Sequence, residues 1–373
     1  MRDIASEVAS INLHGVWPIP ESHAPRARLL GKRSMPLRLA LVGLPLILLC
    51  VGAASYSQSL PADLQGDIYT HDPSMIRQGK TYYVFSTGSP NGSINHGNIQ
   101  IRVSDDRIRW HFVNTVFEEI PTWIINALGT RPRSLWAPDI SYFNGKYHLY
   151  YAGSLFGTNN SVIGLATNRT LDPTSPDYKW IDEGLIIRSA TTDSWNAIDP
   201  NLSFDAKGAP WLSFGSFFSG IKLRRIDSRT GKLSASDTTL YSLAARPGVG
   251  IGGAIEAPTI IYHQGYYYLF VSFDFCCRGV KSDYKIMVGR AKSITGPYLD
   301  QQDKRMDQGG GSLILAGDEH YIGPGGQSVY RDGKTFLLVH HYYDALEKGR
   351  AKLQINELRW TDAGWPVVLQ KSN

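Results

Sequence analysis

One short phrase recurs five times along the chain and limits the fold more than any other feature. Each copy holds a Pro or Gly, a strand-like stretch, a turn with Gly and an aromatic strand-like stretch, which together predict a β-hairpin. Counted from Pro73, Pro138, Pro200, Pro258 and Gly326, the copies stand 65, 62, 58 and 68 residues apart. This spacing is too long for a helical solenoid and leaves room for four strands and their loops. The sequence therefore predicts an all-β fold, a five-bladed β-propeller.

Three copies of the phrase carry an acidic residue at nearly the same place, namely Asp72, Asp199 and Glu256. In a propeller the first strand of every blade runs beside the central axis, so acids at the start of these strands would meet in one cleft. A single Asp before Pro is more often a turn residue. Three acids in register within a five-fold repeat favour a functional site instead.

The surroundings of the acids suggest how they could divide the cleavage of a glycosidic bond. Such cleavage needs a protonated carboxyl group for the leaving oxygen and an ionised one on the opposite face of the sugar. Glu256 lies in the apolar, glycine-rich stretch GIGGAIEAP, which disfavours its charged form. Asp72 follows His71 in a more polar setting and suits a base that activates water.

These motifs, HDP at Asp72, NAIDPN at Asp199 and G-x-IEAP at Glu256, resemble those of the endo-1,5-α-L-arabinanases of glycoside hydrolase family 43. The resemblance extends from about residue 64 to the C-terminus. It implies a five-bladed propeller that hydrolyses arabinan, a pectin side chain of plant cell walls, with inversion. It also implies that Asp72 is the general base, Glu256 the general acid, and Asp199 the residue that tunes the pKa of the acid and orients it.

The same resemblance suggests residues that contact the sugar. NAID and GSFFSG resemble the stretches from which arabinanases contact arabinose rings, which points to Asn196, Ser216 and Phe217. Trp136 could stack on a sugar face or pack in the core, and the sequence leaves both open. Asp139 follows its Pro, whereas the other acids precede theirs, so we expect it to support the site or brace the hairpin.

A metal ion is also implied by the resemblance. The fifth phrase has no acid but ends in VHHYYD, and arabinanases place a His before such a Tyr-x-Asp near the axis. That match is His341, which would reach a central ion, usually calcium, largely through water because calcium prefers oxygen ligands. No stretch has the ligand spacing of a zinc site.

The N-terminal part differs in character from the rest. The apolar run at residues 39–54 follows Arg38 and has the layout of a secretory signal, so we predict a leader (1–34), a signal peptide (35–58) starting at Met35, and the propeller (59–373). A signal anchor that leaves the protein membrane-bound is the alternative. Loss of the signal would remove Cys50 and leave Cys276 and Cys277, which form either a vicinal disulfide or two reduced thiols.

Charge and composition limit the partners. Of the formal net charge of +5, the first 58 residues supply +3 (six basic against three acidic), which leaves +2 for the remainder (32 against 30). A nearly neutral body without runs of like charge excludes a nucleic-acid partner and suits an uncharged polysaccharide. We expect a secreted protein with no membrane contact after signal removal, and a monomer, since a closed propeller exposes no sheet edge that needs a partner.

Other functions fit parts of the pattern. An exo-acting arabinofuranosidase or a β-xylosidase could use the same three acids, because loops at the end of the cleft decide between exo and endo cutting. A non-catalytic sugar-binding propeller would need aromatic platforms but not three aligned acids in unlike surroundings. The invertase-like group is disfavoured, since its NDPNG-type phrase and its acid before a Cys are both absent.

Overall fold

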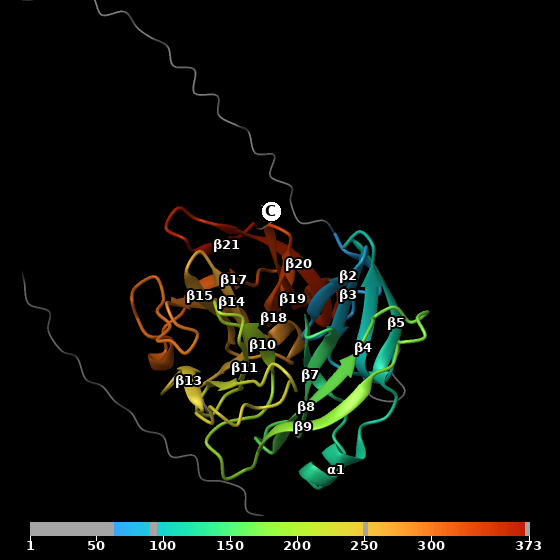
Figure 1. Cartoon of the computed structure of the whole chain (residues 1–373). Coiled ribbons are helices and arrows are strands. Elements are labelled where there is room, and N and C mark those ends of the chain that lie inside the picture. The colour runs from blue at the N-terminus through green and yellow to red at the C-terminus, as the bar shows by residue number, and fades with distance from the viewer. Residues whose placement is uncertain (1–62, 90–94, 249–252, 370–373) are drawn as a thin grey trace, which may run out of the picture. The chain divides into compact units, whose positions relative to one another are not determined.

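The computed structural model describes residues 63–89, 95–248 and 253–369, which form five sheets arranged around a common centre (Figure 1). They belong to a unit that spans Gln58–Asn373. The predicted leader, the signal segment and Cys50 lie outside the described residues. Each sheet is one blade, so the predicted five-bladed β-propeller is confirmed.

The blades follow one another along the chain. The first contains β1 (Gln65–Gly66), β2 (Ser74–Gln78), β3 (Thr81–Ser86), β4 (Asn98–Ser104) and β5 (Arg109–Phe117), and the second contains β6 (Trp136–Phe143), β7 (Lys146–Ser154), β8 (Ser161–Asn168) and β9 (Ile181–Ser189). The third contains β10 (Asn201–Phe204), β11 (Pro210–Phe214), β12 (Ile221–Arg225) and β13 (Tyr241–Ala244). The fourth contains β14 (Ile255–His263), β15 (Tyr266–Phe273), β16 (Lys285–Ala291) and β17 (Ser312–Ala316), and the fifth contains β18 (Tyr321–Asp332), β19 (Thr335–Asp344), β20 (Arg350–Trp360) and β21 (Pro366–Val368).

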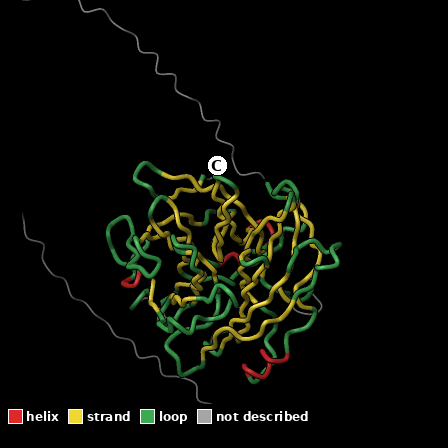
Figure 2. The backbone as a smooth tube through the Cα atoms, in the orientation of Figure 1, coloured by secondary structure: helices red, strands yellow, loops and turns green. Residues whose placement is uncertain are grey.

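Helices are few in the described residues, as the tube view shows (Figure 2). They are α1 (Thr122–Leu128) and the 3-10 turns η1 (Gly279–Lys281), η2 (Met306–Gln308) and η3 (Ala345–Glu347). α1 follows Pro121 and stops at Gly129, whose φ of 74° is the left-handed conformation in which Gly ends helices. None of these helices has the length and apolar character needed to cross a membrane.

The ring closes by packing between blades, not by strand exchange. Each blade comes from one continuous segment, and β1 joins the outer edge of its own blade by pairing in parallel with β5. The inner strands β2, β6, β10, β14 and β18 lie beside one another around the axis, and β18 meets β2. At this closure the Ser328 hydroxyl donates to the Pro73 carbonyl at 2.8 Å.

Apolar side chains fill the spaces between neighbouring blades. Five buried clusters exist among the described residues, and each joins two adjacent blades, as Phe85 and Leu149 do for the first two. Because a blade is covered on both faces, its second strand is buried along nearly its whole length, as in β15. The hydrophobic effect therefore stabilises the ring at each blade–blade contact.

The backbone repeats one left-handed residue per blade, at or near the start of the inner strand in four blades and within β18 in the fifth. Its φ values are 51° at Asp72, 42° at Ala137, 55° at Asp199, 52° at Ala257 and 55° at Gly326. Four of these residues precede the repeated prolines. The sequence predicts that Gly326 takes the proline position in the fifth copy, and this is wrong by one residue: the φ pattern puts Gln327 there.

Candidate active site

The three predicted acids lie at the same end of the propeller, where the inner strands begin. Asp72 and Asp199 are themselves left-handed residues of the repeat, whereas Glu256 comes one residue before the left-handed Ala257. A cavity of about 30 Å³ on the axis is lined by Asp72, Asp199 and Ala257, among others. The Ala257 N–H donates to Asp199 Oδ2 at 3.1 Å, which ties the third blade to the fourth beside Glu256.

Asp72 is held in its ionised form by its neighbours. Its Oδ2 lies 2.8 Å from His71 Nδ1 and accepts the Thr87 hydroxyl at 2.6 Å. Burial alone would raise the pKa of Asp72, but the charge and hydrogen bond of His71, with help from His341 and Thr87, lower it to about 2. Asp72 is therefore a carboxylate at any pH near neutrality, as a base that activates water must be.

Glu256 has the opposite environment. It is 8% exposed, and its Oε2 accepts the Ser216 hydroxyl at 2.6 Å. Burial raises the pKa of Glu256 to about 7, aided by the charge of Asp72 and only partly opposed by Ser216 and His71. A carboxyl group with this pKa holds its proton in mildly acidic solution and can donate it to a leaving group.

Asp199 shares this cluster with the other two acids. Burial, together with the charges of Glu256 and Asp72, raises the pKa of Asp199 well above its ordinary range. This environment favours the neutral form of Asp199 more than water does. That Asp199 tunes and orients the acid stays a prediction.

The donor atoms at and around His341 show whether a calcium ion would fit the predicted site. His71, Asp72 and His341 offer ligand atoms within 4.8 Å of one another. His341 is fully buried, its Nδ1 accepts the Asp72 N–H at 3.1 Å, and its Nε2 has no hydrogen-bond partner among the described residues. Burial lowers the pKa of His341 well below its usual range, so the ring is neutral. One unpartnered ring nitrogen in a cluster that holds the Asp72 carboxylate fits a cation that keeps most of its own water.

Gly326 leaves the space that Asp72 and His341 occupy. A Cβ at this residue would lie 2.4 Å from Asp72 Oδ1 and 2.6 Å from His341 Cε1. The φ of 55° disfavours a side chain as well. The absence of a side chain at Gly326 in the GPGGQSVY phrase therefore allows His341 and the Asp72 carboxylate to approach each other.

Of the four residues predicted to contact sugar, two are half-buried and two are buried. Trp136 is half-buried at the start of β6, and Phe217 is half-buried with its ring centroid 5.7 Å from that of Phe275. Asn196 is buried and its Oδ1 accepts the Ser161 hydroxyl at 2.7 Å. Ser216 is buried too and bonds Glu256. Contact of these four with a sugar stays a prediction.

Asp139 braces three blades. It is buried at 6% exposure and accepts hydrogen bonds from the hydroxyl of Ser74, the amide of Asn201 and the backbone N–H of Leu202. Burial raises the pKa of Asp139 to about 7 against the effect of these three donors. The sequence left open whether Asp139 supports the site or braces its own hairpin; the donors lie in the first and third blades, so it joins neighbouring blades beside the axial cavity.

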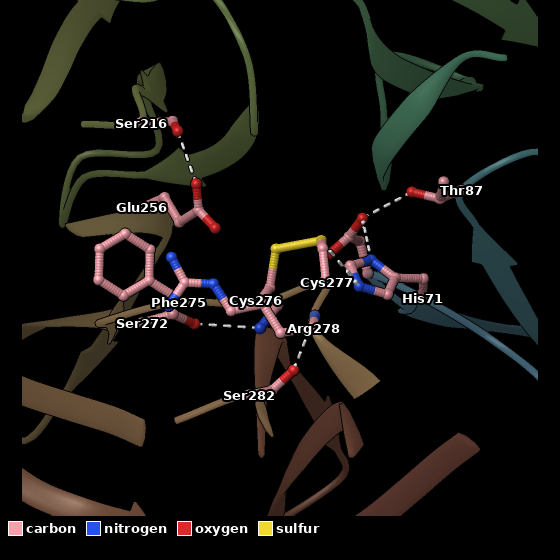
Figure 3. Close-up of a disulfide and its surroundings, with 12 residues drawn as sticks. His71, Thr87, Ser216, Glu256, Ser272, Phe275, Cys276, Cys277, Arg278 and Ser282 are labelled. Atoms are coloured by element: carbon pink, nitrogen blue, oxygen red, sulfur yellow. Dashed lines mark hydrogen bonds and ion pairs between the residues drawn. A yellow bond between two sulfur atoms is a disulfide. The ribbon is translucent and has the colours of Figure 1, made fainter. Parts of the chain in front are cut away.

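Sequence reasoning missed several neighbours of the acids. Thr87 comes from the end of the first blade's second strand, and Tyr343 from the fifth blade, where its hydroxyl lies 2.8 Å from His71 Nε2. Cys276 and Cys277 are joined in a vicinal disulfide, which settles the alternative between disulfide and thiols. Figure 3 shows this disulfide between His71 with Thr87 on one side and Glu256 with Ser216 on the other. Only the adjacent cysteines were visible as a signal in the sequence.

Comparison with known proteins agrees with this geometry. The sequence pattern of glycosyl hydrolases family 43 matches residues 67–366. The chain belongs to this family. It is 47% identical over 296 residues to the extracellular endo-α-(1→5)-L-arabinanase 1 of Bacillus subtilis (strain 168), covering 79% of this chain and 86% of that protein.

Two further proteins resemble the chain closely. It is 42% identical over 310 residues to the extracellular exo-α-(1→5)-L-arabinofuranosidase ArbA of Cellvibrio japonicus (strain Ueda107), covering 81% of this chain and 86% of that protein. The crystal structure of a GH43 endo-arabinanase from Bacillus licheniformis superposes with a TM-score of 0.75 at 46% identity, covering 82% of this chain and 99% of that one. The chain is therefore a family 43 glycoside hydrolase with relatives of both cutting modes.

Proposed function

We propose that this enzyme hydrolyses internal α-1,5-L-arabinofuranosidic linkages of arabinan with inversion. The observation that carries the proposal is the contrast between two carboxyl groups in one cleft: Asp72, with a pKa lowered to about 2, and Glu256, with a pKa raised to about 7. This contrast is what an acid and a base need in order to act together. The endo-arabinanase of Bacillus subtilis at 47% identity supports the substrate and the internal cut.

Each acid has a defined role in this reaction. Asp72 accepts a proton from a water molecule, whose oxygen then attacks the anomeric carbon. Glu256 gives its proton to the oxygen that leaves from the other face of the sugar. His71 and Thr87 keep Asp72 oriented by sharing its Oδ2. A cavity of about 340 Å³ beside these two residues gives room for an arabinosyl unit near the base.

We propose that a calcium ion belongs to this site. His341 Nε2 and the carboxylate of Asp72 would face it, largely through water, and its charge would help to keep the base ionised. A chelator such as EGTA should lower the midpoint of thermal unfolding as well as the activity, and added calcium should restore both. An unfolding midpoint that chelator and calcium leave unchanged would refute the proposed ion.

We also propose secretion. The two relatives named above are described as extracellular, and the apolar run at residues 39–54 has the layout of a signal. N-terminal sequencing of the natural product should find a mature protein that begins after residue 54. A product that still starts at Met1 would contradict secretion by cleavage.

The decisive experiment is product analysis on linear arabinan. Internal cutting should lower the viscosity quickly while reducing ends rise slowly, and nuclear magnetic resonance should first detect the anomer opposite to that of the substrate. Release of single arabinose units from the start would favour the exo mode of the Cellvibrio japonicus relative. Binding without new reducing ends would refute hydrolysis.

A further inference from the structure

The vicinal disulfide lies within the active site. Cys276 and Cys277 follow β15 of the fourth blade, and Figure 3 shows the bridge between the Glu256 side and the His71 side of the cleft. Cys277 is exposed, and its Sγ lies 3.8 Å from His71 Nε2. A bridge between adjacent residues cannot join distant segments, so stapling the fold does not account for it. Its effect must be local.

The bridge fixes a backbone N–H. The disulfide closes a small ring that contains the peptide bond between the two cysteines, and Cys277 is held at a φ of 65°, which a residue with a side chain rarely adopts. In this conformation the Cys277 N–H donates to the Tyr343 hydroxyl oxygen at 2.7 Å. Without the ring, the peptide would be free to turn away.

The next bond reaches His71. Tyr343 Oη accepts the Cys277 N–H and lies 2.8 Å from His71 Nε2. His71 Nδ1 in turn lies 2.8 Å from Asp72 Oδ2. A continuous chain of hydrogen bonds thus joins the Cys277 peptide to the base and fixes the plane of the His71 ring from both sides.

We propose that Tyr343 and the Cys276–Cys277 disulfide are positioning residues for the base: the bridged peptide orients the Tyr343 hydroxyl, which holds the His71 ring and so the direction of Asp72. This inference rests on the proposed function, because it assigns roles in the same hydrolysis. The route passes through residues of the first, fourth and fifth blades. It predicts that the disulfide and Tyr343 act on the rate as one unit.

A double-mutant cycle tests this unit. We would measure kcat and KM on arabino-oligosaccharides for the wild type, Tyr343→Phe, the double variant Cys276→Ser/Cys277→Ser, and their combination. Loss of one hydrogen bond should lower kcat about tenfold in each variant while KM changes less than about twofold. The combined variant should be no slower than the slower parent, because both changes interrupt the same path.

Reversible reduction gives a second measurement that needs no cysteine variant. Dithiothreitol converts the bridge to two thiols and is itself oxidised to its cyclic disulfide. Reduction should lower kcat of the folded wild type about tenfold, reoxidation should restore it, and Tyr343→Phe should lose no further activity on reduction. Tyr342→Phe is the matched control, since Tyr342 lies on the other face of β19 against Tyr321 and should keep wild-type behaviour.

The outcomes separate this inference from the proposed function. An oxidised wild type that does not cleave arabinan would refute the hydrolase and this role together. With an active wild type, losses that add in the combined variant would show that disulfide and Tyr343 act separately and would refute the inference alone. Unchanged kcat on reduction, or a loss confined to KM, would refute it as well.

Discussion

Removing the Ser216 hydroxyl tests directly what sets the pKa of Glu256. It donates to Glu256 Oε2 at 2.6 Å, and it is the largest effect that opposes burial at this carboxyl. A donor stabilises the ionised form more than the protonated form. Ser216→Ala removes the donor and leaves the buried site more apolar, so the pKa of Glu256 must rise from about 7.

The size of the rise follows from the strength of the bond. A hydrogen bond to a charged group contributes about 1.5 to 3 kcal/mol, and one pKa unit corresponds to about 1.4 kcal/mol. The pKa of Glu256 should therefore increase by about one to two units. Because the acid works only when protonated, activity should persist to higher pH in the variant, and the alkaline limb of the kcat/KM profile should shift upward by that amount.

The assay is the pH dependence of kcat/KM on linear arabinan, measured within the range where both proteins stay folded. Ser213→Ala is the control, because Ser213 is also fully buried but donates to the Asn201 carbonyl. Its alkaline limb should stay in place. A limb that stays in place in Ser216→Ala, or moves to lower pH, would refute the assignment of Glu256 as the group that sets it.

Three further outcomes are expected. Glu256→Gln should lose at least about a hundredfold in rate on arabinan but much less on an aryl arabinofuranoside whose leaving group needs no proton, whereas Asp72→Asn should lose both activities; equal losses on both substrates would contradict these roles. Asp199→Asn should lower the rate and also shift the pH profile, because Asp199 and Glu256 lie in one buried cluster in which their ionisations are linked; an unchanged profile would argue against a tuning role. Asp139→Ala should lower the free energy of unfolding in urea by about 3 kcal/mol, since three donors lose their buried acceptor, and a loss below about 1 kcal/mol would contradict the brace.

The fold and the position of the acids were predictable because their signals are local. Each hairpin phrase, with its Pro, predicts an inner strand and the turn before it from about fifteen consecutive residues. Five copies of the phrase then predict a ring of five blades. Asp72, Asp199 and Glu256 could be found because each belongs to such a phrase. The fifth copy was misaligned by one residue because Gln327 stands where the other copies have Pro, so that only the φ of Gly326 reveals the register.

The partners of the acids could not be predicted because they depend on contacts between blades. Tyr343 is 272 residues from His71 in the chain, and Cys277 is 66 residues from Tyr343. No local pattern encodes which residues of the fourth and fifth blades face the first. Ser216 was found through its motif as a residue that contacts sugar, whereas in the structure its hydroxyl is engaged by Glu256.

The difference in protonation between the acids arises from the asymmetry of the ring. Asp72 and Asp199 occupy equivalent places, with φ values of 51° and 55° before a Pro, yet the pKa of one is lowered and that of the other is raised. Burial raises the pKa of both residues, and their backbone conformations are alike, so neither burial nor the backbone causes the difference. It follows from the unlike neighbours of the two acids: His71 and Thr87 of its own blade and His341 of the fifth blade for Asp72, and the carboxyl of Glu256 of the fourth blade for Asp199. A fivefold repeat can place acids together, but only unlike neighbours can give them different chemistry.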